Sequence, residues 1–255
     1  MSAKSSPARI ACLALSLAFA GSMPARAEPP QPASETAAER TTALAAQRVT
    51  QFVAHRGASA ERPENTLAST LRAIEVSASA VEVDVRTTQD GALVLLHDAA
   101  LHRTTSGQGQ VGEKTLAEIQ QLSIQHAGDK ATADHRVPTL IEVLAVCRGK
   151  IDVLLDLKES GEVYDRRVAQ TIQKHGEPAR TIVGVRSVEQ AQAFRRLLPQ
   201  ARQLGLIARP QDIEAYAAEG VETIRIWPAW LEKEPALADR VRQAGAKLHV
   251  NGTQG

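Results

Sequence analysis

From Phe52 onward, short apolar runs alternate with longer amphipathic stretches, and this rhythm constrains the fold more than any other feature of the sequence. Strand–helix alternation at this spacing predicts a parallel sheet whose strands are connected by helices. The runs expected to be strands are FVA (52–54), AVEVDV (80–85), ALVLL (92–96), IDVLLDL (151–157), TIVGV (181–185), QLGLI (203–207), VETIRIW (221–227) and KLHV (247–250).

Eight such runs favour an α/β fold of the TIM (β/α)8 barrel class over a doubly wound sheet. No GxGxxG turn follows the first run, which counts against a dinucleotide-binding fold. A polar stretch at 101–136 interrupts the rhythm, and we expect a loop insertion on the face where barrels keep their chemistry. The amphipathic stretches predict helices at 66–77, 140–147, 165–174, 188–198, 212–218 and 237–244, with a short helical piece at 116–122.

The N-terminus has the composition of an export signal. Two basic residues precede an apolar run of 11 residues (10–20), and Ala25-Arg26-Ala27 is a small-x-small cleavage site. This order predicts a signal peptide over 1–27 and an exported chain, periplasmic or secreted. A membrane anchor is the alternative, but a span needs about 20 apolar residues. We expect 28–50 to be a flexible segment and 51–255 to be the barrel domain.

Charge and cysteine content exclude several classes of partner. Without 1–27 the formal charge is −2 rather than +1, a balance that offers no footprint for nucleic acid or anionic lipid. No later segment is long and apolar enough for stable membrane insertion. Cys12 lies in the signal segment, so Cys147 has no partner for a disulfide, and its apolar helical setting predicts a buried, inert thiol.

Two carboxylates lie inside the apolar run at 80–85. Strand side chains alternate, so Glu82 and Asp84 face the same side. Two adjacent buried carboxylates repel each other and need a cation or bound protons, which a hard divalent ion would supply. The alternative is an exposed edge strand with a polar face. Asp156 and Lys158 have the same i, i+2 relation in a later run, so a third carboxylate and a cation could join this site.

Two histidines, His55 and His97, each follow an apolar run, which would place both on one rim of a barrel. Such a pair can take a proton from a nucleophile and give one to a leaving oxygen. Arg56 adds a planar donor suited to a phosphoryl oxygen, and Gly57 allows a sharp turn. The remaining histidines are expected to be solvated or structural: His102, His126, His135, His175 and His249.

Taken together, these motifs resemble the glycerophosphodiester phosphodiesterase family. The pattern spans 54–158 and is specific as a whole, whereas from Thr181 onward only the alternating rhythm agrees. The matching motifs are His55-Arg56-Gly57, Pro63-Glu64-Asn65-Thr66, Glu82-x-Asp84, Thr88-x-Asp90-Gly91, His97-Asp98-x-x-Leu101-x-Arg103-Thr104-Thr105, Arg136-Val137-Pro138-Thr139-Leu140 and Asp156-Leu157-Lys158.

The resemblance implies a TIM barrel that hydrolyses glycerophosphodiesters to an alcohol and glycerol 3-phosphate, using one divalent metal ion, Mg²⁺ or Ca²⁺. It also implies a role for each matching residue. The metal ligands would be Glu82, Asp84 and Asp156; the general acid and base His55 and His97; the phosphate-binding residues Arg56 and Lys158; and Glu64 would ligate the metal or orient Arg56.

Three readings of the activity stay open at this point. In the hydrolase, the nucleophile is water or the glycerol hydroxyl of the substrate, which would give a cyclic phosphate that is then opened. A phospholipase D-like lyase on the same barrel is the second reading. The third is a truncated, non-catalytic binding protein, because the chain has no match to the family's closing Thr-Asp-x-Pro segment. We therefore expect a barrel that is incomplete at the C-terminus.

Overall fold

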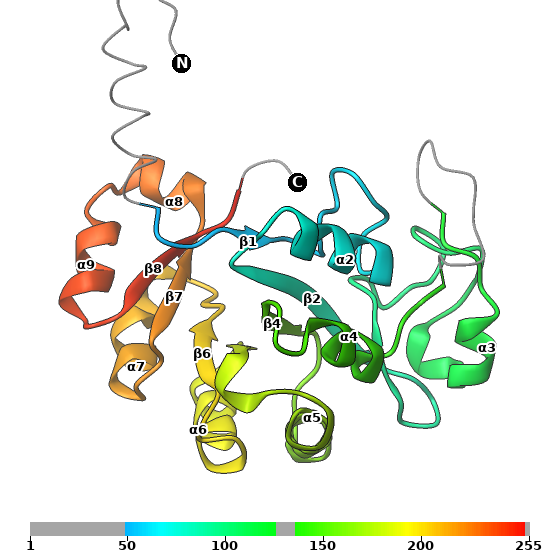
Figure 1. The fold of residues 1–255 in the computed structure, drawn as a ribbon. Coiled ribbons are helices and arrows are strands. Elements are labelled where there is room, and N and C mark those ends of the chain that lie inside the picture. Colours follow the sequence, from blue (N-terminus) through cyan, green and yellow to red (C-terminus); the bar gives the residue numbers. More distant parts are fainter. Residues whose placement is uncertain (1–48, 126–135, 253–255) are drawn as a thin grey trace, which may run out of the picture. The chain divides into compact units, whose positions relative to one another are not determined.

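The computed structural model describes residues 49–125 and 136–252, which belong to one compact unit (Figure 1). The predicted signal peptide at 1–27 and nearly all of the segment at 28–50 lie outside the described residues. So do two of the histidines, His126 and His135.

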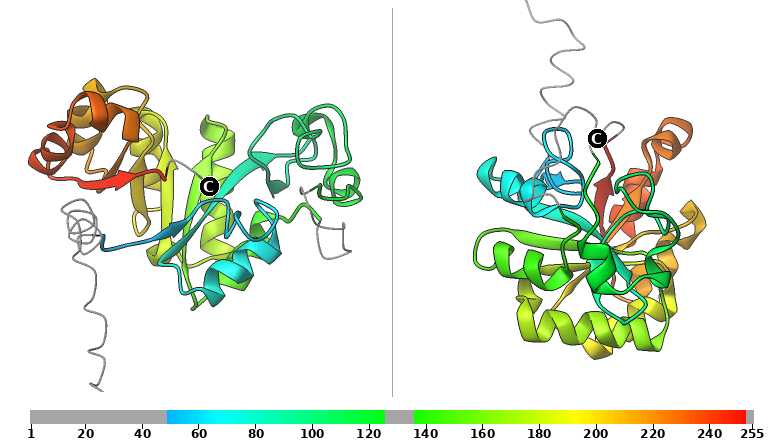
Figure 2. Two further views of the ribbon diagram at one scale, coloured as in Figure 1. Left: turned by 90° about the horizontal axis from the view of Figure 1, so that it is seen from above. Right: turned by 90° about the vertical axis from the view of Figure 1, so that its right-hand side faces the viewer.

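Seven strands of the described chain form a curved sheet in which every neighbouring pair is parallel (Figure 2). No pairing joins the first strand to the last within the described residues, so the sheet is an incomplete (β/α) barrel, as predicted. In spatial order the strands are β1 (Val53–Ala54), β2 (Ala80–Thr87), β4 (Asp152–Leu157), β5 (Thr181–Val185), β6 (Arg202–Gly205), β7 (Thr223–Ile226) and β8 (Lys247–Val250).

The third apolar run does not form a barrel strand. It forms β3 (Leu93–Leu95), which pairs antiparallel with β2, with Leu95 opposite Val85. The prediction that all eight runs form parallel strands is therefore wrong for this one. β2 is the longest strand, and its residues from Val85 onward pair with β3 on the edge opposite β4, beyond the end of β1.

Helices follow the amphipathic stretches closely, and several begin at a polar cap. Thr66, Thr139 and Ser187 each accept a hydrogen bond from a backbone N–H of the first turn, which stabilises the helix start. The helices are α2 (Leu67–Glu75), α3 (Leu116–Gln120), α4 (Leu140–Cys147), α5 (Glu162–His175), α6 (Val188–Leu197), α7 (Ile213–Ala218), α8 (Pro228–Lys233) and α9 (Leu237–Gln243), with short 3-10 turns η1 (Val111–Glu113), η2 (Pro178–Arg180) and η3 (Pro210–Asp212). Only α8 among the α-helices was not predicted, and it begins with proline.

The two faces of the sheet have different chemistry. Val81, Val83 and Val85 of β2 face outward into the main core, which is shared with the helices. The opposite face of β2 carries Glu82 and Asp84 toward the barrel interior. Among the described residues, a small apolar cluster lies on this inner face, and its buried members are Leu154, Leu204 and Leu206. Polar groups therefore occupy most of the inner face near the carboxyl ends of the early strands.

The stretch at 101–136 packs a core of its own. Buried apolar residues from β3, η1 and α3 form a second cluster that is separate from the main core. Its members are Val94, Leu96, Leu101, Val111, Ile119, Ile124 and Val137. The described part of this stretch is thus held by hydrophobic burial and sits directly after the strand that leads to His97.

Cys147 ends α4 in the main core, and burial raises the pKa of its thiol to about 12, which confirms the predicted inert cysteine. Among the described residues, none of the helices combines the length and the apolar character that a membrane crossing requires.

Candidate active site

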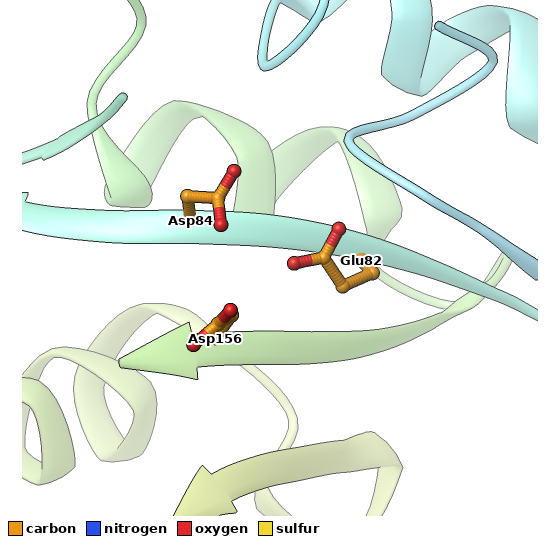
Figure 3. A group of neighbouring side chains, drawn as sticks. All are labelled: Glu82, Asp84 and Asp156. Carbon is orange, nitrogen blue, oxygen red and sulfur yellow. The ribbon is translucent and has the colours of Figure 1, made fainter. Parts of the chain in front are cut away.

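Three carboxylates meet on the inner face of the sheet, at β2 and β4. Asp84 and Asp156 are register partners, and Glu82 lies two residues before Asp84 on the same face. One oxygen from each carboxylate lies within 4.8 Å of the others, and Figure 3 shows the three groups converging between the two strands. Glu82 and Asp84 expose only 6% and 0% of their surface. This acidic triad is a group of described residues that could hold a metal ion.

The acidic triad carries more negative charge than its burial tolerates. Burial, and then the neighbouring Asp84 carboxylate, raise the pKa of Glu82 well above its usual value. Oδ1 of Asp84 is buried without a hydrogen bond, although Nζ of Lys158 lies 2.8 Å away. Hard divalent cations prefer carboxylate oxygens as ligands, so this donor set fits Mg²⁺ or Ca²⁺. A bound cation would give this oxygen a second positive partner beside Lys158.

Two basic side chains hold Asp156. Nζ of Lys158 lies 2.6 Å from one carboxylate oxygen, and Arg186 donates from Nη2 to the other. Burial alone would raise the pKa of Asp156, but the charges of Lys158 and Arg186 outweigh it and lower the pKa. Arg186 was not among the site residues predicted from the sequence. A signal existed, because Arg186 directly follows the apolar run at 181–185, as His55 follows the first run.

The turn after β1 delivers His55 and Arg56 to the acidic triad. Arg56 and Gly57 both have left-handed backbones, with φ of 55° and 80°. A Cβ on Gly57 would lie 2.7 Å from the backbone carbonyl carbon of Ser69, so only glycine fits there. The turn aims the N–H of Arg56 at Oε2 of Glu82, 2.7 Å away, and Nε2 of His55 lies 3.9 Å from the same oxygen.

A chain of ion pairs connects the two predicted catalytic regions. Glu64 accepts from Arg56 at 3.2 Å and binds Arg103 with both carboxylate oxygens, at 2.7 and 2.9 Å. Arg103 also donates to Asp98, which contacts Nδ1 of His97 at 2.7 Å. Hydrogen bonding from Arg103 lowers the pKa of Asp98 to about 2. Glu64 is thus held by two arginines and lies outside the acidic triad, which favours its orienting role over metal ligation.

His97 reaches the site by a different path from the one predicted. It does not end a parallel strand, because β3 runs back along β2. The N–H of Leu96 donates to the carbonyl of Asp84, so the chain returns to the level of the acidic triad just before His97. Arg86 then fixes the backbone by donating from Nη2 and Nε to the carbonyl of His97, at 2.7 and 3.1 Å.

Asn65 is a further residue whose individual role the sequence did not reveal. Its Nδ2 donates to Oδ2 of Asp84 at 2.7 Å, and its Oδ1 accepts from the N–H of Asp84 at 3.0 Å. Asn65 has φ of 56°, a left-handed conformation that asparagine adopts more readily than most residues. Asn65 belongs to one of the motifs that carry the family resemblance, but only the structure shows that its side chain orients Asp84.

All of the predicted site residues lie at this one end of the inner face or are linked to it. The acidic triad suits a hard cation, the arginine and lysine suit an anion, and the imidazoles suit proton transfer. The residues brought together in this way are His55, Arg56, Glu64, Glu82, Asp84, His97, Asp156 and Lys158.

Comparison with known proteins adds a family to this geometry. The sequence profile of the Glycerophosphoryl diester phosphodiesterase family matches residues 55–253. The chain is similar to a glycerophosphodiester phosphodiesterase of Caldanaerobacter subterraneus subsp. tengcongensis, with 31% identity over 205 residues, 78% of this chain and 84% of that protein. It is also 30% identical over 217 residues to a probable glycerophosphodiester phosphodiesterase 1 of Mycobacterium tuberculosis, covering 77% and 79% of the two chains.

Solved structures give the same result. The crystal structure of a glycerophosphodiester phosphodiesterase from Agrobacterium tumefaciens matches with a TM-score of 0.69 and 30% identity, over 81% of this chain and 89% of that one. A phosphodiesterase of Oleispira antarctica, solved in complex with the product sn-glycerol-3-phosphate, matches with a TM-score of 0.64 and 22% identity, over 83% and 87%. At that identity the second match shows the fold alone.

Proposed function

Because the chain belongs to the glycerophosphoryl diester phosphodiesterase family, we propose that it hydrolyses glycerophosphodiesters to an alcohol and glycerol 3-phosphate. The acidic triad is the observation that carries this proposal: three converging carboxylates lie beside the His55 imidazole and beside Arg56 and Lys158, whose charges suit a phosphate. The imidazole of His97 is linked to this group through Asp98, Arg103 and Glu64. The Oleispira antarctica protein, of the same fold, was solved with the product that this reaction would release.

Glu82, Asp84 and Asp156 would hold one divalent metal ion, Mg²⁺ or Ca²⁺. When bound, such an ion stabilises negative charge that develops on phosphoryl oxygens. The protein's own contribution is to keep the three carboxylates aligned. Asn65 fixes Asp84 with two hydrogen bonds, and the N–H of Arg56 fixes Glu82 with a third.

Arg56 and Lys158 would bind the substrate phosphate beside the acidic triad. Nζ of Lys158 lies between Asp84 and Asp156, and Nε of Arg56 lies 3.5 Å from Asp84 and has no hydrogen bond. A guanidinium with an unused donor and a nearby ammonium suit phosphoryl oxygens. The phosphate would thereby be held at the edge of the carboxylate cluster, next to His55.

The two histidines would share the two proton transfers of the hydrolysis. One takes the proton of the nucleophile, and the other gives a proton to the departing alcohol oxygen. Burial, and then the charge of Arg56, lower the pKa of His55, which keeps its ring neutral and able to accept a proton at neutral pH. Asp98 engages Nδ1 of His97, so Nε2 is the nitrogen left for exchange with the substrate.

A turnover assay tests the proposal. The chain is incubated with glycerophosphocholine and Mg²⁺, Ca²⁺ or Mn²⁺, and glycerol 3-phosphate is quantified for wild type, His55→Ala and Glu82→Ala. We expect the wild type to release the product and both variants to lose at least about 100-fold in rate. His175→Ala, a histidine at the end of α5 that was expected to be solvated or structural, is the matched control and should keep wild-type activity.

The outcomes separate the competing readings. No turnover with any of the three ions contradicts the enzyme proposal, and unchanged rates in both variants contradict the assignment of the site. A cyclic glycerol phosphate that accumulates as the final product would support the lyase instead.

We also propose that residues 1–27 are a signal peptide and that the protein works in the periplasm or outside the cell. The support is the order of basic, apolar and small residues at the N-terminus. N-terminal sequencing of the protein recovered from the exported fraction should find Glu28 as the first residue. Activity confined to the cytoplasm, with residues 1–27 retained, would contradict this proposal.

A further inference from the structure

Arg225, on β7, lies on the same inner face of the sheet as the acidic triad. Register partners run across the sheet from Asp156 to Gly184, from Gly184 to Leu204, and from Leu204 to Thr223. Side chains of such partners point to the same face, and residues two apart on a strand do so too. Arg225 follows Thr223 by two residues and therefore points into the barrel, one pleat nearer the carboxyl end of its strand.

Arg225 is buried without an acidic partner. Only 9% of its surface is exposed, its Nε has no hydrogen bond, and it forms no ion pair within the described ranges 49–125 and 136–252. Burial, and then the nearby Arg186, lower the pKa of Arg225, while the carboxylates of Asp156 and Glu82 act in the opposite direction. The guanidinium is thus close enough to the acidic triad for the carboxylates to affect its pKa, although it does not contact them.

The basic side chains of the early strands are in a different state. Lys158 contacts two aspartates, Arg186 contacts Asp156, and Arg56 contacts Glu64. A buried cation without a partner is costly, and proteins seldom keep one without a use for it. The charge of Arg225 is therefore available to an anion that enters the barrel from outside the chain.

Trp227 holds Arg225 in position. The guanidinium carbon of Arg225 lies 4.1 Å from the centre of the Trp227 ring. One face of the planar guanidinium stacks on the indole ring, which fixes the orientation of the plane. The N–H groups along the edge of the guanidinium stay available for hydrogen bonds. Such a preorganised edge matches two oxygens of a phosphoryl group.

We propose that Arg225 contacts the substrate, with its guanidinium edge binding a phosphoryl oxygen of the diester from β7, across the barrel interior from Arg56 and Lys158. This assignment rests on the proposed diesterase function for the identity of the anion. Under this assignment the second half of the barrel supplies one substrate-binding residue, Arg225. The other proposed binding and catalytic residues come from the first half.

Binding of the product tests the assignment independently of turnover. Titration calorimetry measures the Kd of glycerol 3-phosphate and of inorganic phosphate, with the metal ion that supports activity, for wild type, Arg225→Gln and Arg225→Lys. We expect Arg225→Gln to raise both Kd values roughly 10- to 100-fold and Arg225→Lys to raise them less. The matched control is Arg202→Gln, which removes an arginine from the same face of the neighbouring strand, at its opposite end. The control should stay within about twofold of wild type.

Thermal unfolding of the ligand-free protein separates binding from folding. Arg225 has no acidic partner in the described chain, so relief of its buried charge should offset the lost stacking on Trp227, and Arg225→Gln should leave Tm nearly unchanged. A lower Tm together with unchanged Kd values would show a purely structural arginine and overturn the proposal. Failure of the wild type to bind either anion would overturn it as well.

Substrates with different alcohols locate the contact on the diester. If Arg225 binds the phosphoryl group, Arg225→Gln loses the same factor in kcat/KM for glycerophosphocholine and for glycerophosphoserine. A loss confined to the serine ester, with unchanged Kd for inorganic phosphate, would place Arg225 against the alcohol and overturn the proposal. Arg225-dependent binding of glycerol 3-phosphate without any turnover by the wild type would uphold Arg225 and contradict the diesterase function.

Discussion

The two ends of β4 carry the same side chain in opposite circumstances. Asp152 at its start and Asp156 near its end share the inner face. Arg180 donates to one oxygen of Asp152 at 2.9 Å, and Arg202 donates to the other. Asp156 also contacts two cations, but two more carboxylates, Glu82 and Asp84, lie within a few ångströms of it.

The two aspartates differ in the carboxylates around them: two basic partners lower the pKa of each, but Asp156 also lies beside Glu82 and Asp84. Burial alone would raise the pKa of Asp152, but the hydrogen bonds from Arg180 and Arg202 outweigh it and lower the pKa. At the other end, burial and Asp84 raise the pKa of Glu82. At the Asp152 end, the negative charge is neutralised by two arginines in a structural cluster. At the Asp156 end, the clustered carboxylates can bind a cationic ligand. This agrees with the rule that barrels place stability at the amino ends of their strands and chemistry at the carboxyl ends.

The largest expected difference between the two ends is in turnover. Asp156→Asn should lower kcat/KM for glycerophosphocholine roughly 100- to 1,000-fold, because it removes one of the three carboxylates that would hold the metal. Asp152→Asn, the same change on the same strand, should stay within about twofold of wild type. Steady-state kinetics at saturating metal measure both. Similar losses in the two variants would show that the difference in charge balance has no functional meaning.

A smaller effect is expected on stability. Here the variant at the amino end of the strands, Asp152→Asn, should lose more than the variant in the acidic triad, Glu82→Gln. Asp152→Asn leaves two arginines with one weak acceptor, which should cost about 1 kcal/mol because these side chains are partly exposed. For a domain of this size, that lowers Tm by about 2–4 °C. Glu82→Gln keeps the acceptor for the N–H of Arg56 and removes a repelled charge, so the Tm of the metal-free protein should not fall. Calorimetric scans in a chelating buffer measure both Tm values. A lower Tm in Glu82→Gln as well as in Asp152→Asn would contradict this prediction.

The sequence predicted the acidic triad because strand periodicity decides which residues share a face. Glu82 and Asp84 follow from alternation within one run. For Asp156 alternation indicated only that it could join them, and the family resemblance assigned it to the metal site. The direction of β3 could not be predicted, since a short apolar run such as 92–96 has the same composition in a parallel or an antiparallel strand. His97 was therefore placed at the site for the wrong reason.

Arg225 and Arg186 show what periodicity leaves undetermined. Alternation places Thr223 and Arg225 on one face of β7, but which face is inward depends on the register of the strands between β4 and β7. An arginine in a strand of mixed character is more often solvated than buried. The register of these strands is set by their packing against the helices. The sequence alone therefore does not predict which residues of neighbouring strands are paired.

Glu64 allows a test of how far the charged network extends from the acidic triad. Glu64→Gln should lower kcat/KM about 10-fold, because Arg56 and Arg103 lose the carboxylate that orients them. The Kd of the metal, measured by calorimetry, should not change. Glu142→Gln, which breaks the ion pair between Arg136 and Glu142 of α4, is the control and should change neither kcat/KM nor the Kd of the metal. A weaker metal affinity in Glu64→Gln would make Glu64 a ligand, the alternative that its two arginine partners disfavour.

The smallest expected effect is the pH dependence of stability, whose sign differs between the two ends. Glu82 has a raised pKa in the folded protein, so it contributes stability below its usual pKa and loses that contribution as the pH rises through the folded value. Asp152 has a lowered pKa, so its contribution is present above its usual pKa and is lost as the pH falls.

In the metal-free protein, the Tm of Glu82→Gln should therefore rise relative to wild type as the pH increases from the acidic range toward neutrality. The Tm deficit of Asp152→Asn should instead shrink as the pH decreases. Adding the divalent ion should remove the advantage of Glu82→Gln at neutral pH, since the ion stabilises the ionised triad only in the wild type. Parallel pH profiles for the two variants would mean that the acidic triad is already neutralised by Lys158 and Arg186, and that the protein needs no added charge to tolerate it.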